Sequence, residues 1–287
     1  MKPHQSNDSQ EEQRRLPWYL NESEKPDNLS LAYDKFTYWN MGGQNPNKCK
    51  DALGKFVDHA SGDLIVKTMS VVKDQYLKNF FVYQQSLEKQ GYFVKCFELE
   101  LAAPLVIGLG IQHVLEIGFM FHRSYGIPYI PGSSLKGLTK SYLSAVNKEN
   151  LNQIFGQEKK EGDSGFSGNV VFWDSFPTNW FSKNFLEEDI MTPHFGDYYT
   201  QQKLPTTNMA VIPISFLRIK QGTCWNFRVS SRLPGQEYQS LVEQAKGYLE
   251  EALKETGLGA KTALGYGWFK DPSSNPSTLA PNKNRRI

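Results

Sequence analysis

Residues 126–142 read GIPYIPGSSLKGLTKSY, a stretch in which an extended segment passes into a helix. Pro128 and Pro131 hold the chain extended and disfavour helix at the residues before them. Behind Gly132, apolar residues recur at Leu135, Leu138 and Tyr142, a spacing typical of one buried helix face. We therefore expect a helix over residues 133–146, with an extended entry segment in front of it.

The start of this predicted helix has the composition of an anion site. A helix begins with unpaired main-chain N–H groups, and two hydroxyls and two ammonium groups follow here within a few residues. Phosphate is the anion most often bound by such a site. The alternative is that this helix, like many that begin with Pro-Gly-Ser, binds only water. A nucleotide-binding P-loop is excluded, because Leu138 stands where that motif requires lysine. The candidate residues are Gly132, Ser133, Ser134, Lys136 and Lys140.

The composition limits the class of protein. The 287 residues allow one large domain or two small ones, and 32 Lys and Arg against 30 Asp and Glu give a net charge of only +2. Any basic surface must therefore be local. Cys49, Cys96 and Cys224 are far apart, which is typical of a reducing compartment. The five histidines form no metal-type pair, so we expect no metal and no cofactor. Without an apolar signal core or a long apolar run, the protein is expected to be cytoplasmic, with no membrane partner.

The two ends of the chain differ from its middle. Residues 1–90 are predicted to form a polar tail followed by a helical region. Between Gly62 and Gly91, apolar residues recur at steps of three and four, which predicts a long helix with one buried stripe. Residues 272–287 hold prolines, small polar residues and basic side chains, and we expect a flexible basic tail, for which plain solvation is the alternative.

From residue 93 the pattern becomes that of an α+β domain. Apolar residues alternate with Glu98 and Glu100, which predicts a half-buried strand, and further extended segments lie at 114–121 and 168–173. Residues 209–217 and 223–229 are predicted to pair as a hairpin around Gln221-Gly222. A helix at 236–253 and a short strand at 266–269 complete the order. The order is that of the ferredoxin-like fold, with two helices on one sheet face and the other face free. RNA-recognition modules and many enzymes share it, so the fold alone assigns no function.

A second glycine-rich segment, GLGAKTALGYGWF, occupies residues 257–269. Its main chain is expected to approach a phosphate closely, with N–H groups gathered around the anion and Lys261 adding charge. The alternative is a helix-to-strand connector whose glycines only supply positive φ angles. The candidate residues are Gly257, Gly259, Ala260, Lys261, Thr262, Gly265 and Gly267.

Together the two segments resemble the repeat-associated (RAMP) proteins of CRISPR systems, in which a glycine-rich loop leads into the last strand of a ferredoxin-like domain. Three further pieces narrow the resemblance: Ile154-Phe155-Gly156, the run Val-Val-Phe-Trp-Asp at 170–174, and Asp189 to His194 followed by Tyr198-Tyr199. This set is similar to the sixth RAMP subunit of the type III-B (Cmr) complex. The resemblance implies a RAMP domain over residues 91–271, and residues 1–90 match none of its motifs.

The resemblance also implies a function. Such a subunit is non-catalytic, binds guide (CRISPR) RNA near its 3′ end and caps the filament of backbone subunits in antiviral defence. Its partners would be the guide RNA, the complementary target RNA and other RAMP subunits. RNA held by phosphates and sugars keeps its bases free to pair. We therefore expect residues 132–136 and 257–267 to lie side by side and clamp RNA, with Lys136 and Lys261 as main cations and Lys140 at the edge.

An aromatic-rich insertion is predicted over residues 175–208. Its side chains either stack on bases, form a satellite core or face a neighbouring subunit, and the usual burial of aromatic residues favours core or interface. The aromatic residues are Phe176, Trp180, Phe181, Phe185, Phe195, Tyr198 and Tyr199.

Two other classes of function stay open. CRISPR repeat-processing endoribonucleases share this fold and loop, and use a histidine as a metal-independent general acid or base. The candidates are His113, His122 and His194, with His122, Arg123 and Tyr125 as the best local cluster, although the sequence shows no carboxylate or lysine partner. The third class is a protein-interaction subunit that touches little RNA, which the long helix and near-zero net charge would suit.

Overall fold

The computed structural model describes residues 27–36, 46–113, 117–146, 151–157, 164–179, 185–192 and 213–272. The polar residues 1–15 and nearly all of the predicted basic tail lie outside these ranges. So does most of the aromatic-rich insertion, including Trp180, Phe181, Phe195, Tyr198 and Tyr199, as well as the candidate His194.

The central sheet has the strand order β11 (Phe269–Lys270), β1 (Val94–Leu101), β10 (Cys224–Ser231) and β6 (Val170–Phe172). All neighbouring pairs are antiparallel, and β7 (Phe176–Pro177) pairs with the first half of β10. In β1, Leu99 and Leu101 are buried while Glu98 is exposed, as the alternation predicted. The chain thus forms an α+β domain on an antiparallel sheet.

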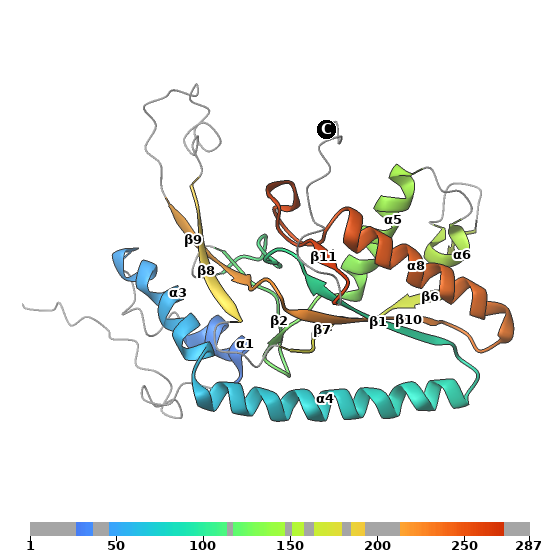
Figure 1. The fold of residues 1–287 in the computed structure, drawn as a ribbon, viewed down its shortest axis with the longest axis horizontal. Helices are drawn as coiled ribbons and strands as arrows, with labels where there is room; N and C mark the ends of the chain where they lie inside the picture. Colours follow the sequence, from blue (N-terminus) through green and yellow to red (C-terminus); the bar gives the residue numbers. More distant parts are fainter. Residues whose placement is uncertain are drawn as a thin grey trace, which may run out of the picture.

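Two helices, α5 (Gly132–Ala145) and α8 (Gln239–Glu255), pack together on one face of this sheet (Figure 1). Buried residues recur every three or four positions, as in Leu135, Thr139 and Leu143 of α5. A fully buried leucine contributes roughly 1.5–3 kcal/mol relative to an exposed one. The two predicted helices are confirmed, and α5 starts one residue before the predicted range.

The opposite face of the sheet is covered by α4 (Asp63–Lys89), which runs along it in Figure 1. The prediction of a free face is therefore wrong. Phe80 of α4 meets the Trp173 ring edge-on at 5.2 Å, and the Arg228 guanidinium lies 3.6 Å from the centre of the Phe80 ring. Tyr76 packs on Phe176 at 4.5 Å. The apolar stripe read from the sequence needs a partner, and the sheet supplies it. The sheet face that was expected to be free is therefore occupied by α4.

The predicted hairpin around Gln221-Gly222 is also wrong. Both strands form, but β9 (Ile214–Ile219) pairs with β8 (Leu186–Met191) in a separate sheet. Neither edge of β10 is open, because β1 occupies one and β6 with β7 the other. A main-chain bridge between Leu105 and Ile219 ties β9 to the domain. In Figure 1 the β8–β9 hairpin stands beside α3 (Pro46–Ala60), apart from the central sheet.

The N-terminal helical region is confirmed: α1 (Leu29–Leu31), the π-helical turn η1 (Ala32–Phe36) and α3 precede α4. Short elements complete the domain: β2 (Phe121–His122) pairs with β3 (Ile127–Pro128), and β4 (Gly156–Gln157) with β5 (Phe166–Ser167). Of the expected extended segment 114–121, residues 114–116 lie outside the described ranges and only Phe121 is in a strand. The remaining short helical elements are α6 (Asn152–Phe155), η2 (Gln236–Tyr238) and η3 (Thr262–Leu264). Within the described ranges, no helix is both long and apolar enough to cross a membrane.

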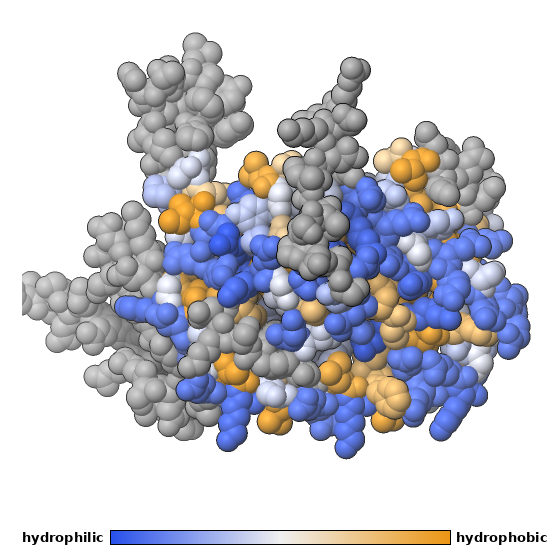
Figure 2. Space-filling view, viewed as in Figure 1, coloured by the Kyte–Doolittle hydropathy of each residue, from blue (hydrophilic) through white to orange (hydrophobic). Residues whose placement is uncertain are grey.

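The surface shown in Figure 2 is mostly polar, with small separate apolar patches. Along α4 the exposed apolar side chains include Val71, Phe81 and Val82. Apolar residues scattered in this way are ordinary on a protein surface and do not by themselves mark an interface.

Candidate nucleic-acid interface

The glycine-rich loop is held by close main-chain contacts. Gly267 has a φ of +72°, and a Cβ there would lie 1.8 Å from the carbonyl oxygen of Leu258. The N–H groups of Leu258, Ala260 and Gly267 donate to the carbonyls of Gly267, Val106 and Pro104, each at 2.8 Å. These N–H groups are committed to the fold. The N–H groups of Leu264, Gly265 and Tyr266 also bond carbonyls within the loop, so much of the loop main chain is not available to a ligand.

The start of α5 is held just as closely. A Cβ on Gly132 would lie 2.1 Å from the carbonyl oxygen of Phe172, so only glycine lets the helix start against β6. The Gly132 N–H donates to Asp174 Oδ1 at 2.7 Å. A carboxylate therefore already occupies the position at which the sequence suggested a bound anion.

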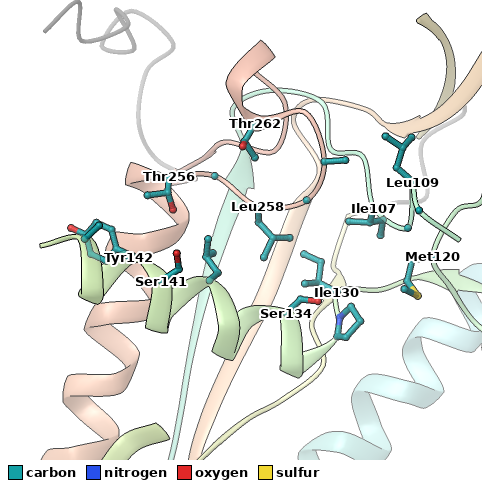
Figure 3. Close-up of a pocket in the computed structure, with 18 residues that line it drawn as sticks. Ile107, Leu109, Met120, Ile130, Ser134, Ser141, Tyr142, Thr256, Leu258 and Thr262 are labelled. Atoms are coloured by element: carbon teal, nitrogen blue, oxygen red, sulfur yellow. The ribbon is translucent and has the colours of Figure 1, made fainter. Parts of the chain in front are cut away.

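A groove of about 590 Å³ lies between α5 and the glycine-rich loop, and we call it the loop groove. Figure 3 shows the two elements facing each other across it, with Leu258 projecting between them. Its wall is largely apolar, and the polar side chains that line it are the hydroxyls of Ser134, Ser141, Thr256 and Thr262, with Tyr142 at one end. Among the described residues, no charged side chain lines this groove.

A second groove of about 610 Å³ lies on the other side of α5, and we call it the basic groove. Lys136 and Lys140 line it together with Ser133 and Arg232, which follows β10. Because successive helical residues point in different directions, Ser133 and Ser134 line different grooves.

The structure thus divides the predicted residues into two sets. Ser134, Gly257, Gly259, Ala260 and Thr262 meet in the loop groove, as the sequence led us to expect. The basic groove takes Gly132, Ser133, Lys136 and Lys140, away from the loop, while Lys261, Gly265 and Gly267 line neither groove.

Lys261 belongs to a contact between the loop and the β8–β9 hairpin. It has a φ of +61°, and its ammonium lies 5.2 Å from the centre of the Phe216 ring of β9. Beside it, the Tyr266 hydroxyl donates to Asp189 Oδ2, and Arg218 bonds the same oxygen at 2.7 Å. Asp189 stood in one of the family motifs, but nothing in the sequence pointed to its partners.

Burial acts on the pKa of Asp189 in the opposite direction to charge and hydrogen bonding. Partial burial pushes its pKa upward, but hydrogen bonds from Tyr266 and the Ile190 N–H, with the Arg218 charge, outweigh this and hold the pKa of Asp189 below its usual value. The Asp189–Arg218 ion pair is therefore present at neutral pH and joins β8 to β9. The Tyr266 hydroxyl, which donates to Asp189, links the glycine-rich loop to this hairpin.

Of the three candidate histidines, the structure describes His113 and His122, and both are packed as structural side chains. His122 stacks on Tyr125 at 4.6 Å, and its Nδ1 accepts the Tyr125 N–H at 3.3 Å. His113 stacks on Tyr33 at 4.1 Å. Burial lowers the pKa of both rings, so the neutral form is favoured at pH 7. Within the described ranges, no three His, Cys, Asp or Glu side chains are grouped closely enough to hold a metal ion.

The class of protein follows from this architecture and from its match to known families. Residues 98–270 contain both grooves, the glycine-rich loop and the central sheet except for the first four residues of β1. These residues match the family model of the RAMP superfamily. The chain belongs to this superfamily.

Within the superfamily, the sequence is similar to the Cmr6 subunits of CRISPR Cmr systems, as the motifs predicted. It is 27% identical to Cmr6 of Pyrococcus furiosus, over 79% of this chain and 81% of the relative. It is 25% identical to Cmr6 of Saccharolobus solfataricus, over 79% of this chain and 76% of the relative. Its fold also resembles a chain in the cryo-EM structure of the type III-B Cmr-beta complex bound to cognate target RNA. That match has a TM-score of 0.58 and 21% identity, over 79% of this chain and 75% of that one.

Proposed function

We propose that the protein is a non-catalytic, RNA-binding structural subunit of a type III-B CRISPR effector (Cmr) complex, which binds the guide RNA backbone near its 3′ end and caps the filament of backbone subunits in antiviral defence. Its partners are then guide RNA, complementary target RNA and other RAMP subunits. The similarity to Cmr6 subunits supports the complex. The observation that carries RNA binding is that Ser134 and the 257–262 segment, far apart in sequence, line one groove.

The chemistry of the loop groove suits a ribose chain. Its hydroxyls donate and accept hydrogen bonds, and its apolar wall fits the sugar face, whereas a phosphate would find no cation inside. The 2′-hydroxyl is the group by which a protein distinguishes RNA from DNA. Lys261 lies next to the lining residue Thr262 and provides charge for a phosphate at the rim. Bound in this way, the bases keep their pairing edges free.

The domain organisation supports the same proposal. The sheet order, with one helix after the first strand and one before the last, matches a ferredoxin-like RAMP domain, to which we assign residues 91–271. We assign residues 1–90 to a polar tail and a helical N-terminal region, whose α4 covers the sheet. We assign residues 175–208 to an aromatic-rich insertion and residues 272–287 to a basic tail. Because α4 covers one face and α5 with α8 the other, RNA is left to the grooves beside α5.

The test measures binding of a fluorescent 12-nucleotide RNA, and DNA of the same sequence, to the full chain. The double variant Ser134→Ala/Thr262→Val removes two hydroxyls from the loop groove. Each lost hydrogen bond costs about 0.5–1.5 kcal/mol, so RNA should bind roughly 5- to 140-fold more weakly while DNA binding changes little. Ser144→Ala is the control, because this exposed α5 hydroxyl bonds its own helix at Lys140 and lines neither groove. Equal losses for RNA and DNA, or none, would contradict the proposal.

A further inference from the structure

The basic groove is the more strongly charged of the two grooves beside α5. Lys136 and Lys140 come from α5 and Arg232 from the end of β10, and none of the groove's lining residues is an aspartate or glutamate. This is unusual in a chain with 32 basic and 30 acidic residues. Convergent cations repel one another unless an anion joins them.

The same three cations have no ion pair within the described part of the chain. Other basic side chains of the domain do: Lys254 bonds Glu250 and Asp271, and Lys270 bonds Glu100 at 2.8 Å. Lys140 and Arg232 are exposed, and Lys136 is half-buried, so all three are accessible to a ligand in the groove.

The facing wall of the basic groove is apolar. Phe166 of β5 and Val171 of β6 line it and are 49% and 38% exposed. The hydroxyls of Ser133 and Ser167 lie in the same groove. Cations beside an exposed aromatic ring form the surface on which single-stranded nucleic acid binds, with phosphates on the cations and a base stacked on the ring.

The two grooves flank the N-terminal end of α5. Ser134 lines the loop groove and its neighbour Ser133 the basic groove. An α-helix is about 10 Å across, and a stacked strand advances about 3.4 Å per nucleotide, so about three nucleotides pass the helix. Because Asp174 occupies the first helix N–H, lysine and arginine side chains, not the helix end, must hold the phosphates there.

We propose that one RNA strand crosses the start of α5 and occupies both grooves, with Arg232 as a phosphate contact and Phe166 as a stacking platform. This extension rests on the proposed function. An acidic segment of a partner protein is the competing occupant, but the exposed aromatic ring beside the cations favours RNA.

The experiment compares the full chain with the triple variant Lys136→Gln/Lys140→Gln/Arg232→Gln. For a 12-nucleotide RNA, each lost phosphate contact flattens the slope of log affinity against log salt by about 0.7, so the triple variant should lose about 2. A 4-nucleotide RNA is long enough for one groove only. Its affinities for the triple variant and for the wild type should differ much less than those of the 12-nucleotide RNA. Phe166→Ala should weaken the longer RNA by roughly 5- to 100-fold.

The matched control is Lys67→Gln/Lys78→Gln/Lys89→Gln, which removes the same charge from exposed positions on α4, over the other sheet face. Its salt slope should stay near that of the wild type. If both triple variants have equal salt slopes and Ser134→Ala/Thr262→Val still binds RNA weakly, RNA does not occupy the basic groove. That result would leave the proposed function standing. Loss of binding to an acid-rich 12-residue peptide, with RNA binding unchanged, would assign the groove to a protein partner instead. A wild-type chain that binds no RNA would overturn both proposals.

Discussion

Replacing Gly267 by alanine measures how much of the glycine-rich loop is fixed by the fold. An alanine at φ +72° costs about 1–2 kcal/mol in backbone conformation. Its Cβ would lie 1.8 Å from the Leu258 carbonyl oxygen, so the main chain at position 267 must move away from Leu258. This breaks the hydrogen bonds from Leu258 N to Gly267 O and from Gly267 N to Pro104 O, each worth about 0.5–1.5 kcal/mol. The expected loss in unfolding free energy is about 2–5 kcal/mol.

Gly265→Ala provides the matched control. Its φ is +95°, but a Cβ there meets nothing within 4 Å, so only the conformational cost of about 1–2 kcal/mol applies. Urea unfolding followed by circular dichroism gives both values. In thermal unfolding, each kcal/mol lowers Tm by about 2–4 °C for a domain of this size. Equal destabilisation by the two substitutions would refute the idea that the close approach to Leu258 requires glycine at position 267.

Three further predictions concern other parts of the molecule. Phe80→Ala should lower the unfolding free energy by about 2 kcal/mol, because it removes the α4 ring that packs on Trp173 and Arg228. Phe81 is the control, because its side chain is 59% exposed. In the same urea titration, Phe81→Ala should change the unfolding free energy by under about 0.5 kcal/mol. The pKa of Asp189 is lowered in the folded chain. Its contribution to stability is therefore complete above the unfolded pKa of about 3.9 and is lost as the pH falls through the folded pKa. The difference in unfolding free energy between wild type and Asp189→Asn, measured from pH 7 to pH 3, should shrink towards acid, and a constant difference would argue against the ion pair. Incubation of the full chain with repeat RNA in EDTA should yield no site-specific cuts, because His122 is packed on Tyr125 and its pKa is lowered; defined cuts that disappear in His122→Ala would restore the endoribonuclease interpretation.

Much of the fold was predictable because local patterns repeat over several turns or pleats. The spacing of Leu135, Leu138 and Tyr142 predicted α5, and the alternation around Glu98 predicted β1. Strand pairing was harder to predict from the sequence. Gln221-Gly222 does form a turn, but pairing across it needs an open edge on β10, and residues distant in sequence had already filled both edges.

The candidate site was predictable in part. The glycines and serines identified two segments that do line a common groove. The sequence also placed Lys136 and Lys140 on a separate helix face, but gave no indication that Arg232 lies opposite them. Nor did it show that Asp174 bonds the first N–H of α5, since a residue 42 positions away can be placed only by the path of the chain.

By itself, the sequence determined the long helices α4, α5 and α8, most strands of the central sheet, the need for glycine at the sharp loop, and the superfamily. Each of these depends on short-range spacing or on a local motif. The tertiary structure alone decided that α4 covers the second sheet face and that β9 pairs with β8 and not with β10. It also decided that α5 separates Lys136 and Lys140 from the glycine-rich loop. Each of these outcomes depends on which surfaces and edges remain available once remote segments have packed, and no local pattern records that competition.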